Sequence, residues 1–244
     1  MLTILRRIRR SLIDSGSARK YLLYTIGEIT LVVIGILIAL QINNWNQNRL
    51  DHNKAELMLR EINSEFLINK KELTNTLKVY KRVFEKLGIM IESFPIDVNA
   101  HEIDSLTSFF QGSSTVLDAD LSEGSVSALI NSSAFEIISN PELRTLLVQW
   151  RDLVADYQKA EAMVIKHTVE EYFPYMDEHM PHVSKEGIRD GRINLSFLGS
   201  TQFVNLLKRN RFYIGIMLNI AGGENGKLMH AIDRIVELST PKDK

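Results

Sequence analysis

The chain of 244 residues contains no cysteine, and this absence excludes three kinds of chemistry. Without a thiol the protein forms no disulfide, holds no metal through thiolate ligands and has no cysteine nucleophile. Net charge is also small, -1 at pH 7, so no global electrostatic field attracts nucleic acid. We therefore expect neither DNA nor RNA as a partner.

Motifs for catalysis or nucleotide binding are missing as well. The glycine-rich residues 221–226 lack the Gly-x-x-x-x-Gly-Lys-Ser/Thr order of a phosphate loop and follow no predicted strand. The serine-rich residues 118–133 lack the strand-turn-helix context of a nucleophile elbow. His167 and Glu171 do not form the zinc motif H-E-x-x-H. We assign no catalytic residue, no cofactor and no metal site.

One polar segment keeps an alternative open. Carboxylates and imidazoles gather in it at Asp177, Glu178, His179 and His182. Such side chains bind zinc or act as acids and bases, but their spacing matches no recognised ligand pattern, which favours a solvated loop. The alternative function is an extracytoplasmic enzyme or metal-binding domain that uses this loop.

The most informative stretch that is present is a long apolar run, residues 21–42. At about 1.5 Å per residue it forms a helix of roughly 33 Å, enough to cross a hydrocarbon layer of about 30 Å. Residues 29–40 are apolar on every face except at Thr30, unlike a soluble helix. The run is longer than that of a signal peptide and no clear cleavage site follows it. We expect a transmembrane helix.

Helical spacing places small and polar residues of this run on one stripe. Gly35 and Ala39 form a small-xxx-small pair, which lets two backbones approach closely. Glu28 is costly inside a membrane unless it finds a partner or reaches toward the interface. We predict a helix contact with a second copy or another membrane protein, and a passive anchor is the alternative. The stripe consists of Tyr24, Glu28, Leu31, Gly35 and Ala39.

Charges flanking the run predict its orientation. Positive residues are more frequent before it than after it, and the positive side normally stays in the cytoplasm. Residues 1–20 are therefore expected to form a cytoplasmic basic amphipathic segment, and residues 43–244 an extracytoplasmic domain, with the lipid bilayer of the cytoplasmic (inner) membrane as a partner. Trp45 fits the aromatic belt at the outer interface. The preceding positive residues are Arg6, Arg7, Arg9, Arg10, Arg19 and Lys20.

The remaining chain shows helical periodicity. Residues 49–94 predict a long helix that Ser93 and Pro95 end, and Asn69 interrupts its apolar face. The apolar face consists of Leu59, Ile62, Phe66, Leu73, Leu77, Tyr80, Phe84, Leu87 and Ile91.

A second long helix is expected from the cap sequence Asn140-Pro141-Glu142 to Tyr172, with Pro174 as its stop. A third starts at Ser200 or Thr201, with Phe212 among its core residues, and a last one spans residues 228–238. Few segments alternate like strands. We therefore predict an all-α protein, in which one transmembrane helix precedes a bundle of long antiparallel helices.

Residues 20–46, KYLLYTIGEITLVVIGILIALQINNWN, resemble the opening signature of a bacterial family of single-span, membrane-anchored proteins of unknown function. A looser similarity covers residues 128–147, ALINSSAFEIISNPELRTLL. The resemblance implies a single span and a mostly helical chain, and it implies no known activity. The function we predict is a binding, scaffold or accessory module of the cell envelope.

Overall fold

The computed structural model describes residues 18–96, 110, 115–180, 194–222 and 226–240. All regular secondary structure in these ranges is helical, which confirms the all-α class for the described part. The chain divides into two compact units, Met1–Lys54 and Ala55–Lys244. The sequence from His101 to Phe110 also suggests a short helix, and of these residues the structure describes only Phe110, whose side chain is buried.

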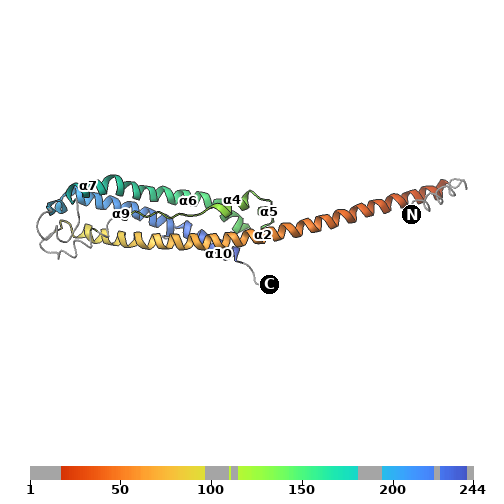
Figure 1. The fold of residues 1–244 in the computed structure, drawn as a ribbon, viewed down its shortest axis with the longest axis horizontal. Helices are drawn as coiled ribbons and strands as arrows, with labels where there is room; N and C mark the ends of the chain where they lie inside the picture. Colours follow the sequence, from red (N-terminus) through yellow and green to blue (C-terminus); the bar gives the residue numbers. More distant parts are fainter. Residues whose placement is uncertain (1–17, 97–109, 111–114, 181–193, 223–225, 241–244) are drawn as a thin grey trace. The chain divides into compact units, whose positions relative to one another are not determined.

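Helix α2 (Ala18–Glu92) contains the apolar run (Figure 1). Among the described residues it is the one helix that is long and apolar enough to cross a membrane. The apolar part lies near the N-terminus, and none of it is buried by other parts of the chain. By length and composition it is a candidate membrane span. The helix ends shortly before Pro95, as predicted, since proline disfavours helical geometry in the residue before it.

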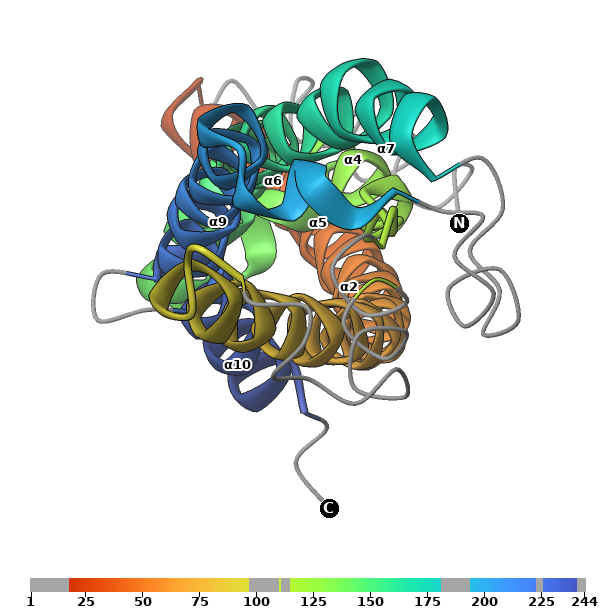
Figure 2. The ribbon, with the colours of Figure 1, turned by 90° about the vertical axis from the view of Figure 1, so that its left-hand side faces the viewer.

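The second unit contains the remaining helices. In it α6 packs against α9 and α10, and α9 also packs against α10 and η3 (Figure 2). The elements are α4 (Gly124–Ile130), α5 (Ala134–Ile137), α6 (Pro141–His167), the π-helical turn η2 (Thr168–Tyr172), α7 (Phe173–His179), the 3-10 helix η3 (Leu195–Gly199), α9 (Thr201–Gly222) and α10 (Lys227–Ser239).

Polar pairs give the direction in which α10 runs along α2. Asn63 Nδ2 donates to the carbonyl of Val236 at 2.8 Å, and Lys70 pairs with Asp233 at 2.8 Å. As the numbers rise on α2, those on α10 fall. The two helices therefore run in opposite directions within the second unit.

Polar side chains also join the two ends of α6 to α10 and α9. Arg234 of α10 binds Glu142 through two hydrogen bonds of 2.7 Å, while His167 at the other end of α6 bonds to Leu206 of α9 at 3.0 Å.

Local start signals are confirmed. The Asn140 side chain accepts a hydrogen bond from the Leu143 amide at 3.1 Å, and the Ser200 hydroxyl accepts one from Phe203 at 3.1 Å. Both bonds satisfy amides that a helix leaves without internal partners. Helix α9 ends at Gly222 and α10 begins at Lys227.

The predicted stop at Pro174 is wrong. A π-helical turn follows α6, and α7 begins at Phe173, so Pro174 lies in a first helical turn. The π-helical turn directly precedes α7, and the chain remains helical through Pro174 to His179.

The core assignment of Phe212 is also wrong, since its side chain is 63% exposed. At about 100° per residue, Phe212 lies roughly 200° around α9 from Asn210, which the structure buries instead. Most other predicted core residues of the long helices are buried or partly buried.

Substitutions at two neighbouring residues of α6 test this core. Leu147 is fully buried and Val148 is 56% exposed. We expect Leu147→Ala to lower the free energy of unfolding by about 2–5 kcal/mol, because it leaves a cavity. Val148→Ala should change it by about 0.5 kcal/mol or less. Urea unfolding of the full chain in detergent, followed by circular dichroism, measures both. Equal losses would contradict this packing.

Candidate functional site

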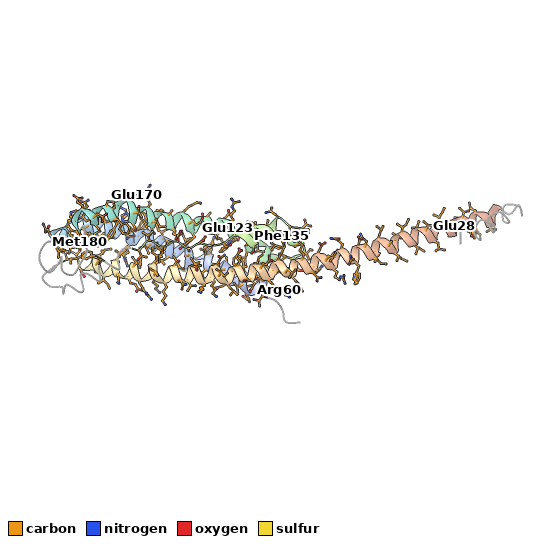
Figure 3. The ribbon with its side chains drawn as sticks, viewed as in Figure 1. Glu28, Arg60, Glu123, Phe135, Glu170 and Met180 are labelled. Atoms are coloured by element: carbon orange, nitrogen blue, oxygen red, sulfur yellow. The ribbon has the colours of Figure 1, made fainter. Side chains whose placement is uncertain are left out.

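The predicted contact stripe lies on one helix, α2, and the first unit leaves it largely uncovered. Glu28, Leu31, Gly35 and Ala39 are exposed, and Tyr24 is half-buried. A Cβ atom added at Gly35 would meet no atom within 4 Å. Figure 3 shows Glu28 projecting from α2. Contact with another helix through this stripe stays a prediction.

Trp45 has the exposure expected of an interface residue. Its side chain is 66% exposed, and the Arg49 guanidinium lies 5.6 Å from the ring centroid. Tryptophan beside a cation is suited to the boundary between lipid tails and water, where one part of the ring is covered and the other is wet. Its position at a membrane boundary stays a prediction.

The second unit has an unusually polar interior where residues 115–123 meet α2 and α6. These residues, the extended segment, form neither helix nor strand. Asn69 donates to the Ser122 carbonyl at 2.9 Å and accepts from the Ser122 amide at 2.9 Å. Tyr80 bonds in the same two ways to Leu117, donating at 2.6 Å and accepting at 3.1 Å. Two side chains of α2 thus replace a neighbouring strand.

Helix α6 supplies the other contacts of the extended segment. A carboxyl oxygen of Glu161 accepts hydrogen bonds from the Ala119 amide at 2.9 Å and from the Tyr157 hydroxyl at 2.8 Å. Trp150 donates to the Ser122 carbonyl at 3.3 Å, and its ring packs on Phe66 at 4.6 Å between centroids. Glu161 is therefore fixed by backbone and phenol together.

Burial controls the protonation of this cluster. It raises the pKa of Glu161, against the opposing effect of the two hydrogen bonds, and the charge of Asp118 adds to the rise. Burial likewise raises the pKa of Tyr157 and of Tyr80, and Glu161 adds to both. The tyrosines stay neutral donors, which matches their role in binding peptide groups.

A second carboxylate holds the start of α4. Glu65 accepts from the Ser125 amide at 2.9 Å and from its hydroxyl at 2.7 Å. The contact resembles a helix cap supplied from another helix, because it satisfies an amide in the first turn. The hydrogen bonds between Ser125 and Glu65 therefore join the start of α4 to α2.

His167 serves as a core residue. It is 2% exposed, its Nε2 donates to the Leu206 carbonyl, and its Nδ1 lies 3.4 Å from a carboxyl oxygen of Glu171. That carboxyl oxygen also binds Arg209. The imidazole joins α6 to α9.

The polar segment of the alternative function is only partly described. Asp177 and Glu178 are exposed, whereas His179 stacks on Tyr175 at 4.3 Å and bonds to the Tyr175 carbonyl at 2.8 Å. His182 lies outside the described residues. Within the described ranges no three His, Asp or Glu side chains gather as a metal site would require.

Sequence reasoning missed Asn69 and Glu161 as structural ligands of the extended segment. A signal existed for Glu161, since it follows Tyr157 by four residues and precedes Val164 by three, within the apolar stripe of α6. A charge in that register predicts a buried polar partner. The partner itself, residue 119, had no comparable signal.

The raised pKa of Glu161 predicts a pH dependence. In the unfolded chain the pKa of glutamate is about 4.3, so the stabilising effect of its protonation is complete below that pH and is lost as pH rises through the higher folded value. Glu161→Gln stays neutral. We expect the wild type to lose stability relative to Glu161→Gln as the pH rises above the unfolded pKa of about 4.3. Urea unfolding at several pH values measures this, with exposed Glu72→Gln as control. Parallel curves for wild type and Glu161→Gln would contradict it.

Comparison of the chain with protein families, with curated proteins and with solved structures finds no match. The family resemblance of residues 20–46 therefore stays a prediction.

Proposed function

We propose that this protein is a single-pass, membrane-anchored helical module of the cell envelope that binds or scaffolds another molecule. The observation that carries the proposal is the apolar part of α2, none of which is buried by the chain itself. Soluble proteins rarely leave so much continuous apolar surface uncovered. A bilayer covers such a helix completely, so lipid is the first proposed partner.

The second unit is proposed to be a helical bundle in which α9 and α10 run antiparallel to α2 and α6. The residue pairs that join α10 to α2 and α9 to α6 support this order. Bundles bind ligands between their helices and partners on their outer faces. A binding or scaffold role fits these surfaces.

The proposed location is the cytoplasmic (inner) membrane, with the N-terminal end in the cytoplasm. The excess of arginine and lysine in residues 1–20 supports this orientation. Residues 43–244 would then lie outside the cytoplasm. The resemblance of residues 20–46 to a family of single-span proteins agrees with one crossing.

The anchor is also proposed to contact another helix in the membrane. Glu28 lies on the same face as Gly35 and Ala39, and among the described residues no cation pairs with it. An unpaired carboxyl group in lipid is costly, whereas a second helix can supply a hydrogen-bond partner. Close approach at the two small residues would bring such a partner within reach.

Labelling of single cysteines tests the orientation, because the natural chain has none. Lys159→Cys replaces a side chain that is 76% exposed. A maleimide that cannot cross membranes should label it in intact spheroplasts. Ser11→Cys, in the predicted cytoplasmic segment, should react only after lysis. The reverse pattern would refute the proposed topology.

Crosslinking tests the contact face. Gly35→Cys adds its side chain where the chain has free space. We expect a disulfide-linked dimer, or a bismaleimide adduct with another membrane protein, when native membranes are oxidised or treated with the reagent.

Val33→Cys is the matched control, since it lies about 200° from Gly35 around the same helix. It should give little adduct under the same conditions. Equal yields from both variants, or none from Gly35→Cys, would leave α2 as an anchor without a specific contact.

A further inference from the structure

An open groove of about 470 Å³ lies between the C-terminal part of α2 and helix α9. In Figure 1 this is where α9 runs beside the yellow part of α2. The groove combines aromatic and aliphatic side chains with two cations. Its lining consists of Phe84, Ile91, Lys208, Arg211, Phe212, Gly215, Ile216 and Asn219.

Two glycines create the geometry of the groove. A Cβ atom at Gly88 would lie 3.2 Å from Nε of Arg211, and one at Gly215 would lie 3.3 Å from the ring of Phe84. Both distances are tighter than ordinary contacts. The missing side chains therefore let the Arg211 side chain lie against α2, and let the Phe84 ring lie against α9.

Arg211 is held in place without a carboxylate. Its Nε donates to the Phe84 carbonyl at 3.3 Å, and the guanidinium lies 4.2 Å from the centroid of the Phe84 ring. These contacts orient the planar group while its charge stays unneutralised. A guanidinium fixed in this way is preorganised to bind an anion.

The charges of this groove differ from those of the neighbouring one. The second groove, of about 410 Å³, contains Lys159 and also its partner Asp156, with nitrogen and oxygen 3.1 Å apart. The first groove has no acidic lining residue. Within the described ranges, neither Lys208 nor Arg211 pairs with a carboxylate.

The apolar surface of the groove is unusually accessible. Phe212, which lies on the face of α9 opposite its buried residues, is 63% exposed and lines this groove. Ile216 and Ile91 continue the apolar surface beside it. An occupant that covers these side chains removes them from water, which is favourable.

We propose that this groove binds a long-chain carboxylate, a single alkyl chain with one anionic end. The alkyl chain would cover Phe212 and Ile216, and the carboxylate would pair with Arg211 and Lys208. The volume lies in the range of small-ligand sites.

The inference rests on the proposed binding module, because it names a ligand class for it. Its test measures ligand binding at the groove only. The cysteine labelling and crosslinking experiments on α2 can therefore fail while this test succeeds, or the reverse.

The experiment uses the full chain in nanodiscs of zwitterionic phosphatidylcholine. The probe is palmitic acid with a photoreactive diazirine in the middle of its chain. After irradiation, mass spectrometry of peptides should place adducts in residues 84–91 and 208–219. Unlabelled palmitate should compete. Hexadecanol with the same diazirine should give an adduct yield at least about tenfold lower, because the alcohol cannot form the charge-assisted hydrogen bonds.

Single substitutions distinguish the loss of a cation in the groove from a loss of folding. Lys208→Gln changes an exposed residue and should reduce labelling by the acid about tenfold without changing labelling by the alcohol. Arg211→Gln should do the same, although it also contacts Phe84. Asn219→Trp should block the groove for both probes. Lys159→Gln, in the second groove, is the matched control and should leave labelling unchanged.

Several outcomes would overturn the proposal. Equal labelling by acid and alcohol would show an apolar patch without anion recognition. Adducts confined to the apolar part of α2 would show partition into lipid only. Normal labelling in Lys208→Gln and Arg211→Gln, with circular dichroism unchanged, would exclude the proposed carboxylate contact.

Discussion

Some peptide groups of the extended segment lie in the interior of the second unit, buried at Ala119 and partly buried at Leu117 and Ser122, and they impose the constraint on which this unit depends. A buried N–H or C=O group needs a hydrogen-bond partner, and within this segment the backbone itself supplies a bond from the Leu121 amide to the Ala119 carbonyl at 3.0 Å. Within the described residues no strand lies beside residues 115–123. Asn69, Tyr80 and Glu161 take the place of that strand. Each unmatched group would cost about 1–3 kcal/mol, so these three side chains are not interchangeable with apolar ones.

This constraint also fixes how the helices are placed along one another. Asn69 bonds to Ser122 while Tyr80 bonds to Leu117, so the extended segment runs opposite to α2. Sliding α2 by one turn would separate both pairs at once. Apolar side chains alone specify such a register weakly, since neighbouring leucines and isoleucines fill similar space. Directed hydrogen bonds distinguish one register from the next.

Local patterns predicted the helices well, because caps and periodicity act over a few residues. The bonds from Asn140 and Ser200 reach only three residues along the chain. Asn69 seemed from the sequence to interrupt a core face, yet its partner lies 53 residues away. Phe212 was misplaced because helical register, and not hydrophobicity, decides which side chains of α9 are covered. The contact stripe of α2 follows from spacing, whereas its partner would come from another molecule.

Contacts between helices and the surfaces proposed to bind a ligand or a partner differ in whether their charges are paired. Arg234 with Glu142 and Lys70 with Asp233 join helices, and their charges are balanced within the unit. Arg211 and Lys208 face an apolar groove with no acid in its lining. A partner that covers such a surface removes water from the charges, which is unfavourable unless the partner brings the opposite charge. For the groove this requirement selects an anion joined to an apolar body. For the stripe on α2, the same reasoning selects a helix that offers Glu28 a hydrogen-bond donor or a cation.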